Sequence, residues 1–388
     1  MQRPLVVIGV DIGGTKIQAG AIVVDPDGVS DRLVTAEEIP TPRVAPVAFY
    51  DVVAELIRKA REDAAQTGYA SLPLVAVAHP GRFLPNGTLA RSTTPNLGTS
   101  PDQFDGLHPV HELERRLGAH VVAENDAIAQ MRFGLDLLLR NSQIRPLLVD
   151  HTVVYLGPGT GMGGGVAQVS RDGAVTPVTD GHFFDMQVSG YEDGTLTTEE
   201  LLTGPAIARR VVEANANLTP PIHPARGGRL DELLLDPEAP SPQRAVAQHI
   251  ADLEGDILAC IIETIVRGRI VKVRLEVAAN GQMRRHVNES DRAWSAEDQA
   301  LVRGVRRFLF GGFVGCSRGL GARVRQRALE VLRARGLSDV KIFQIPATSG
   351  DAGVLGIVRA ISREQIRSAI HTASSHSPIP PRRNTLKK

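Results

Sequence analysis

The chain has few cysteines, no excess of charge of one sign and no long hydrophobic run. Its cysteines are Cys260 and Cys316, and two cysteines form neither a disulfide framework nor a zinc site made of several cysteines. Lys and Arg number 44 against 43 Asp and Glu, a formal net charge of +1. This balance predicts no nucleic-acid partner. No apolar run reaches the roughly 18 residues that a membrane helix needs, so we expect no membrane partner.

The beginning and the length of the chain indicate where the protein is located and how many domains it has. The opening run MQRPLVVIGVDIGG leads directly into a strand-like segment, without the charged, apolar and cleavage regions of a secretory signal. We therefore expect a cytoplasmic protein. With 388 residues, 42% of them hydrophobic and 22% charged, the chain has material for two or three globular domains.

Hydrophobic periodicity predicts an α/β fold. Strands are expected at 5–10, 20–24, 33–39, 72–78, 119–123, 152–156, 165–170, 307–310 and 340–345. Helices are expected at 47–65, 112–117, 125–139, 245–266, 313 to about 335, and 352–367. A strand, a glycine-rich turn and a second strand occur once in each half, which indicates two similar lobes around a cleft. Segment 219–241, rich in Pro and Gly, is expected to be a surface excursion, and the polar segment 371–388 a disordered tail.

The first glycine-rich turn is Asp11-Ile12-Gly13-Gly14-Thr15-Lys16. Adjacent glycines allow a tight turn whose backbone N–H groups face an anion. Thr15 adds a hydroxyl and Lys16 a cation, while Asp11 suits Mg²⁺ held through water. The spacing is not that of a P-loop. An ordinary hairpin is the alternative, so this turn alone leaves a phosphate role open.

The second turn, residues 157–165, has six glycines in nine residues. Such a stretch can lie flat against phosphate oxygens because no Cβ intervenes, and we favour a phosphate loop over a flexible linker. Gly311 and Gly312 follow a later strand, where they suit either a flat ligand or close helix packing.

Glu124-Asn125-Asp126 lies between these turns, at the expected start of a helix. Asn and Asp at a helix start are usually caps. Between two candidate phosphate loops, however, the Asp126 carboxylate is placed to accept a proton from a substrate hydroxyl. The helix N-terminus would keep it ionised and weakly basic, which suits phosphoryl transfer, where positioning matters more than base strength.

Taken in order, these motifs and Ser349-Gly350-Asp351-Ala352-Gly353 resemble the ROK family of sugar kinases and repressors, which belongs to the actin and hexokinase ATPase superfamily. The resemblance spans about residues 5–361. It implies two ribonuclease-H-like, actin-like ATPase lobes around a central cleft, closure on substrate, and ATP with Mg²⁺. We expect an N-terminal lobe over 1–123 and a C-terminal lobe over 124–370, with the option that the last helix returns to the first lobe.

The resemblance also implies residue roles. Asp126 would be the catalytic base and Asn125 a ligand of sugar hydroxyls, while Gly81, in His79-Pro80-Gly81, would line the sugar site. Gly311 and Gly312 match the adenosine motif. The phosphate-binding positions would be Asp11, Gly13, Gly14, Thr15, Lys16, Gly159, Thr160 and Gly161, with Asp11 also holding Mg²⁺ through water.

The chain departs from the family pattern where a Glu-x-Gly-His run and a cysteine zinc motif are usual. Thr179 occupies the place of that Glu, although His182 is kept, and residues 191–198 contain no cysteine, so no zinc site is expected. His182 and Glu199 are expected to contact the sugar. The alternatives are a structural histidine and a helix-start charge. No role is assigned to Asp185. The segment 267–299, which contains Trp294, resembles an insertion of unknown role.

The resulting prediction is a kinase that transfers the γ-phosphoryl group of ATP to a hydroxyl of a hexose-like substrate. That substrate is either a sugar, as in a glucokinase, or a C7 cyclitol of the valiolone type used in pseudo-sugar biosynthesis. Alternatives are a sugar-sensing ROK transcriptional regulator, for which no helix-turn-helix precedes the first strand, and an inactive sugar-binding protein. By analogy with the family, a homodimer or homotetramer is expected.

Overall fold

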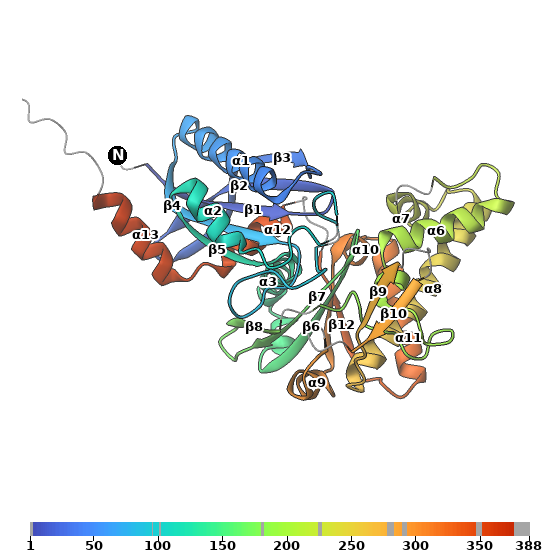
Figure 1. The fold of residues 1–388 in the computed structure, drawn as a ribbon. Helices are drawn as coiled ribbons and strands as arrows, with labels where there is room; N and C mark the ends of the chain where they lie inside the picture. Colours follow the sequence, from blue (N-terminus) through green and yellow to red (C-terminus); the bar gives the residue numbers. More distant parts are fainter. Residues whose placement is uncertain are drawn as a thin grey trace, which may run out of the picture.

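The computed structural model describes residues 3–94, 96–100, 102–179, 182–223, 227–277, 283–288, 293–346 and 351–375. Two five-stranded sheets of mixed direction form two halves of the molecule (Figure 1). The strand orders are β3-β2-β1-β4-β5 and β12-β11-β6-β7-β8, and helices cover both faces of each sheet. The α/β class and the two-sheet architecture expected from the sequence are therefore confirmed.

The first sheet begins with an antiparallel meander and continues with two parallel strands. Strand β1 pairs with β2 on one side and with β4 on the other. Most β1 side chains are buried on both faces, which is why its sequence is a continuous apolar run. The strands are β1 (Leu5–Ile12), β2 (Lys16–Asp25), β3 (Gly28–Pro40), β4 (Ala70–His79) and β5 (His120–Asn125).

Helices from both ends of the chain cover this sheet. Helices α1 (Pro46–Gln66) and α2 (Pro109–Leu117) pack on one face. On the other face lie α12 (Ala352–Ile357), the 3₁₀ turn η2 (Val358–Ala360) and α13 (Arg363–Ser375), drawn in red beside the blue strands in Figure 1. Segments more than 300 residues apart thus form one core. The sequence analysis left open whether the last helix returns to the first lobe, and in the structure it packs on the first sheet.

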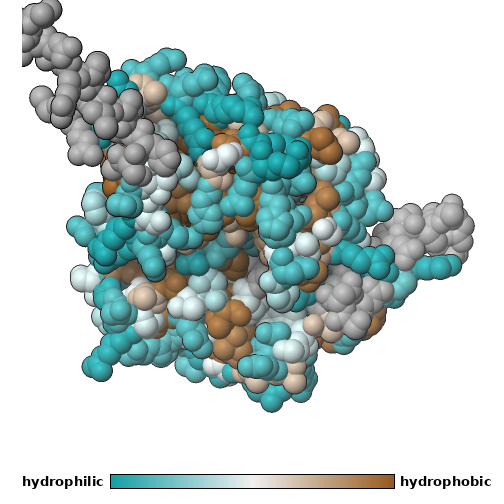
Figure 2. Space-filling view, turned by 60° about the vertical axis from the view of Figure 1, so that its left-hand side comes forward, coloured by the Kyte–Doolittle hydropathy of each residue, from teal (hydrophilic) through white to brown (hydrophobic). Residues whose placement is uncertain are grey.

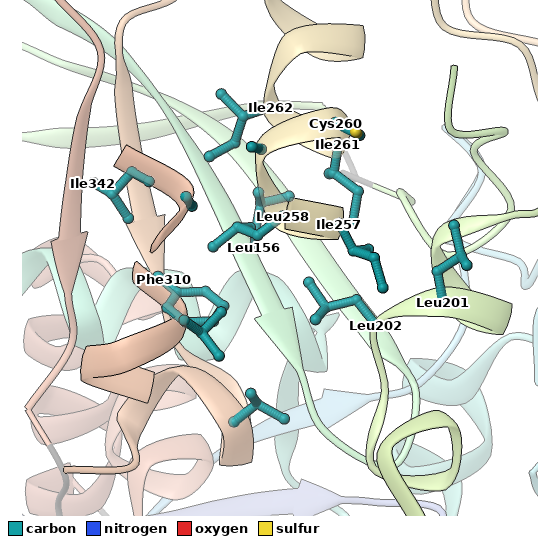
Figure 3. Packing of buried hydrophobic residues seen from close by; sticks show 14 of the residues in the cluster. Leu156, Leu201, Leu202, Ile257, Leu258, Cys260, Ile261, Ile262, Phe310 and Ile342 are labelled. Atoms are coloured by element: carbon teal, nitrogen blue, oxygen red, sulfur yellow. The ribbon is translucent and has the colours of Figure 1, made fainter. Parts of the chain in front are cut away.

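The second sheet packs against two long helices. Leu156 and Phe310 on the sheet face Ile257, Leu258 and neighbouring residues of α8 (Ser241–Val266) (Figure 3). Helix α11 (Leu320–Ala334) lies beside α8 and completes this core. The strands are β6 (His151–Pro158), β7 (Met162–Val169), β8 (Val175–Thr179), β11 (Arg307–Phe310) and β12 (Lys341–Gln344).

Helix α3 (Asp126–Leu139) connects the halves. It packs on the other face of the second sheet, with α4 (Arg145–Leu148), and it also contacts α12 of the first half. A Cβ on Gly356 would lie 2.1 Å from the carbonyl oxygen of Ala129, so the two helices touch backbone to backbone. The start of α3 is consequently held in place from both halves.

Several segments differ from the sequence expectation. Segment 219–241 is not simply a surface excursion, because α7 (Gly227–Leu235) buries Leu230 and Leu233 in the second core. The helix expected at 352–367 is divided by η2 and by Ile361, where the backbone becomes extended. Helix α13 continues to Ser375, so the expected tail from 371 begins inside a helix, and its remainder lies outside the described residues.

The rest of the second half consists of short elements. The expected insertion forms the hairpin of β9 (Val273–Val277) and β10 (Met283–Val287), followed by α9 (Ala296–Val302). The other short helices are α5 (Thr198–Leu201), α6 (Gly204–Ala214), η1 (Asn215–Asn217) and α10 (Gly312–Cys316). The face shown in Figure 2 is mainly hydrophilic with scattered apolar residues. Within the described ranges, no helix is long and apolar enough to cross a membrane.

Candidate active site

A cavity of about 270 Å³ lies where the two halves meet. Its walls come from the turn after β1, the end of β4, the start of α3, the turn between β6 and β7, the segment before α5, and the start of α10. The lining includes Gly13, Gly14, Gly81, Asn125, Asp126, Gly159, Thr160, Gly161, His182, Glu199 and Gly312. Both glycine-rich turns therefore converge on one space, together with Asp126.

The first turn presents only its glycines to the cavity. Strand β1 ends at Ile12 and β2 begins at Lys16, and the turn is closed by a 2.9 Å bond from Gly13 N–H to the Lys16 carbonyl oxygen. A Cβ on Gly14 would lie 2.9 Å from Cβ of Asn96, so glycine is needed for this close approach. Thr15 is exposed and outside the lining.

Lys16 does not supply the expected cation inside the cavity. Its Nζ lies 2.5 Å from Glu38 in an exposed ion pair on the neighbouring strand β3. The guanidinium of Arg43 instead reaches this turn, donating to the carbonyl oxygens of Asn96 and, at 3.1 Å, Gly14. These bonds to carbonyl oxygens stabilise the turn between β1 and β2 from outside.

The second turn is shorter than the run of six glycines suggests. Residues 159–161 alone connect β6 to β7, because the strands extend to Pro158 and from Met162. The additional glycines have a packing role, since a Cβ on Gly165 would lie 2.7 Å from Ile128 and 2.9 Å from Met131. Glycines in β7 thus let α3 approach the sheet closely, while the turn itself lines the cavity.

Asn125 is the N-cap of α3 and also faces the cavity. Its Oδ1 accepts from the N–H groups of Ala127 (3.0 Å) and Ile128 (3.3 Å), and its Nδ2 donates to the carbonyl oxygen of Gly81 (2.9 Å). The capping alternative is therefore real. One N–H of the same amide is not used by these bonds and is available to a ligand hydroxyl.

Asp126 is the first residue of α3, and burial raises the pKa of its carboxyl from 3.8 to about 6, while the bond from Ala127 N–H opposes the rise. Burial, followed by the charge of Asp126, raises the pKa of Asp11 to about 7. Asp126 is thus closer to neutrality than a helix start alone would make it. Neighbouring carboxyls with raised pKa values are common at functional sites.

Asp11, the expected Mg²⁺ ligand, is not among the residues that line the cavity. Its carboxyl packs against Gly353, where a Cβ would lie 1.9 Å from Oδ2, and the charge of Asp126 is close enough to raise its pKa. Mg²⁺ usually keeps several waters and takes one or two carboxylates, and Asp11 and Asp126 are the two carboxylates that would hold it here. In the described part of the chain, no group of three or more His, Cys, Asp and Glu forms a metal site.

His182 and Glu199 line the far wall of the cavity. The ring of His182 packs edge-on against Phe184, with centroids 5.4 Å apart. Oε2 of Glu199 accepts a 2.6 Å bond from Met162 N–H, at the end of the second turn. Burial raises the pKa of Glu199. One carboxylate oxygen is thus tied to the turn and the other remains for a ligand. Residues 180 and 181 of the Gly-His run lie outside the described residues.

The two glycines of the expected adenosine motif lie in different surroundings. Gly312 has φ of +63° and packs on Pro158, so it both allows the close approach and lines the cavity. Gly311 instead packs against Tyr155 and lies outside the lining. The next residue, Phe313, is 54% exposed at the cavity wall, unusual for a large apolar side chain.

Sequence reasoning missed several lining side chains. Thr93 and Asn96 come from an irregular segment after β4, and Gln130 lies one turn into α3. Phe313 follows the glycines of the expected adenosine motif and Phe184 lies two residues after His182, but neither received a role. A turn rich in Thr and Asn gives no sequence signal for a site, because such residues are also typical of ordinary loops.

Comparison with known proteins shows what this chain is similar to. Residues 7–174, which include the first turn, Asp126 and the second turn, match the model of the ROK family. This part of the chain is similar in sequence to the ROK family. The chain is 34% identical over 166 positions to a glucokinase of Streptomyces coelicolor, an alignment that covers 41% of this chain and 42% of that relative. The chain thus matches less than half the length of this curated relative.

Solved ROK structures share the fold over nearly the whole chain. A ROK family glucokinase from Streptomyces griseus, in complex with glucose and AMPPNP, superposes with a TM-score of 0.57 at 20% identity, covering 92% of this chain and 99% of that one. A ROK family transcriptional regulator, a homologue of the E. coli MLC protein, superposes with a TM-score of 0.61 at 13% identity, covering 95% and 81%. The ROK fold therefore occurs here in full, in a framework used by kinases and regulators.

Proposed function

We propose that this protein is an ATP-dependent kinase that phosphorylates a hydroxyl of a hexose-like acceptor. The observation that carries the proposal is that Asp126 lines a cavity whose walls also contain both glycine turns. The glucokinase relatives support this assignment. The protein would bind ATP on the side of the two turns and the acceptor on the side of Asn125, His182 and Glu199.

Asp126 would take up the proton of the attacking hydroxyl group of the substrate. Its carboxyl, with a pKa of about 6, is largely ionised at pH 7 yet basic enough to take a proton as the hydroxyl attacks. Its Oδ1 accepts a 2.9 Å bond from Ala127 N–H, which holds the carboxylate close to one orientation. Such positioning is a large part of the catalysis of phosphoryl transfer.

The nucleotide side would be formed by backbone and one aromatic ring. Gly13, Gly14 and residues 159–161 would place N–H groups against the phosphates, since glycine lets backbone approach an anion closely. The exposed ring of Phe313 offers a stacking surface for the base. Mg²⁺ bound with ATP near Asp11 would neutralise charge on the phosphate oxygens.

The acceptor would be held by polar groups suited to neighbouring hydroxyls. Asn125 offers an N–H donor, Glu199 a carboxylate acceptor, and His182 a ring that donates or accepts according to its tautomer. This set fits a hexose, as in a glucokinase, and also a C7 cyclitol of the valiolone type. The sequence departs from the family pattern at Thr179, which is why the cyclitol stays beside the sugar as a proposed acceptor.

The test is Asp126→Asn, measured by ADP release with ATP and a panel of glucose, mannose, N-acetylhexosamines and valiolone-type cyclitols. Turnover should fall by about 10²–10⁴-fold, because the amide cannot accept the proton. Acceptor binding measured by calorimetry should stay within a fewfold of wild type. Asp136→Asn, on the same helix but outside the cavity lining, is the matched control and should keep its turnover.

Two results would contradict the assignment. Near-normal turnover of Asp126→Asn would exclude Asp126 as the base. A wild-type protein that binds an acceptor tightly but releases no ADP with any of them would favour a sensor, the activity class of the ROK regulator that shares its fold.

A further inference from the structure

A buried positive charge lies beside the proposed acceptor wall, and the chemistry above does not use it. Lys272 is 1% exposed, and its Nζ lies 2.7 Å from Oδ1 of Asp185, itself 5% exposed. The same Nζ donates to the carbonyl oxygen of His182 and lies 5.4 Å from the ring centre of Trp294. A buried ammonium is tolerated only with such partners, so its position is strongly determined.

The segment that Lys272 contacts is part of the cavity wall. Residues 182–185 carry His182 and Phe184 into the lining. Lys272 binds both ends of this segment, the carbonyl of His182 and the carboxylate of Asp185. Backbone pairing strengthens the attachment, since Val273 N–H donates to the Asp185 carbonyl oxygen at 2.8 Å. Lys272 and the start of β9 therefore form a support behind the wall.

The support extends to Glu199. Its backbone N–H donates to the carbonyl oxygen of Phe184 at 3.0 Å, so a displacement of 182–185 would also move the start of α5. The charge of Asp185 also reaches it, because burial and then Asp185 raise the pKa of the Glu199 carboxyl. Lys272 thus offsets the charge of Asp185 and also holds the segment that contains Phe184 in place.

We propose that Lys272 is a positioning residue for acceptor binding, which holds segment 182–185 so that His182 and Glu199 face the acceptor. This inference rests on the kinase function proposed above and assigns a role to the hairpin that the sequence left as an insertion. Lys272 does not touch the acceptor itself. Its loss should therefore raise the KM for the acceptor and leave the KM for ATP unchanged.

The decisive variant removes both charges, because Lys272→Met alone leaves Asp185 buried without its cation and lowers the melting temperature. In Lys272→Met/Asp185→Asn both charges of this pair are removed together, and such replacements of buried pairs are often neutral for stability. The double variant should recover most of the lost melting temperature. Its acceptor KM should nevertheless stay at least tenfold above wild type, with the ATP KM within twofold.

A matched control removes an ion pair elsewhere in the same half. Arg323 on α11 pairs with Asp252 on α8 at 2.5 Å, and neither residue lines the cavity. Arg323→Met/Asp252→Asn should leave both KM values unchanged. A Lys272→Met/Asp185→Asn protein with wild-type acceptor KM would overturn the positioning role. Absence of wild-type ADP release would instead refute the kinase proposal.

Trp294 provides a second measurement that needs no variant. It is the only tryptophan in the chain, and its ring packs on Phe183 at 5.1 Å and beside the Lys272 ammonium. Because Phe183 lies between the two wall residues of this segment, acceptor binding should change the tryptophan emission of the native protein. Emission that stays constant while the acceptor saturates the enzyme would count against the proposal, even if the double variant failed to fold.

Discussion

At the residue scale, the two carboxyls with raised pKa values determine how activity should depend on pH. The pKa of Asp126 is about 6 and that of Asp11 about 7 in the free protein, raised chiefly by burial. Both groups have to be ionised, Asp126 to accept a proton and Asp11 to hold Mg²⁺. We therefore expect kcat/KM for the acceptor to fall below pH 7, with an apparent pKa between about 6 and 7 for the coupled pair.

Acid unfolding by these groups is not the cause of that loss. Their pKa values in the folded chain lie above the ordinary 3.8, so protonation favours the folded state between about pH 4 and 7. Circular dichroism at pH 5.5 should accordingly show an intact fold while kcat/KM has fallen about tenfold or more. A profile that stays flat down to pH 4.5 would show that neither carboxyl titrates as inferred.

At the element scale, the start of α3 tests whether Asn125 is only a cap. Asn125→Ala removes both capping bonds and the bond to the Gly81 carbonyl oxygen. Loss of a cap typically lowers the free energy of unfolding by about 1 kcal/mol. If the amide also binds the acceptor, the acceptor KM should rise by about tenfold, a change of about 1.4 kcal/mol.

The control for this prediction is a cap remote from the cavity. Ser295 caps α9 by accepting from Asp298 N–H at 3.0 Å, and it lies outside the lining. Ser295→Ala should lower the free energy of unfolding by a similar amount, measured by urea denaturation, with both KM values unchanged. If Asn125→Ala matches it in both respects, Asn125 is a cap and nothing more.

The same scale shows why some elements could be predicted from the sequence and others could not. Apolar runs before each glycine turn predicted β1 and β6 because both strands are buried on two faces. The glycines of β7 looked like a long loop, since the close approach of Ile128 and Met131 that requires them lies in another element. The role of Lys272 was not predictable, because its partner Asp185 is 87 positions away.

At the scale of the whole molecule, the candidate site depends on contacts that no local pattern contains. Asp126 was identified from its place between two glycine turns, and the structure brings these three elements to one cavity. Four further residues of the same motifs are not among the lining residues: Asp11, Thr15, Lys16 and Gly311. Motif order thus predicted which segments meet. Which side chain of each motif faces the cavity is decided by neighbours such as Glu38 and Tyr155.

The last element of the chain completes the core of the first half, and this assignment can be tested by hydrogen exchange. Ile366 of α13 is fully buried, and it belongs to the cluster that contains Val7 of β1 and Leu74 and Ala76 of β4. Ile366→Ala should lower the free energy of unfolding by about 2–5 kcal/mol. Amides of β1 and β4 should then exchange faster, with little change in β6 and β11.

Ile342→Ala is the reciprocal control, because Ile342 is 2% exposed in the core of the second half. It should speed exchange in β6 and β11 more than in β1 and β4. If Ile366→Ala instead speeds exchange in the second sheet, or in both sheets equally, the end of the chain does not stabilise the first half as a separate unit. The opposite patterns expected for the two variants follow from their separate hydrophobic clusters, although α3 joins the two halves at the cavity.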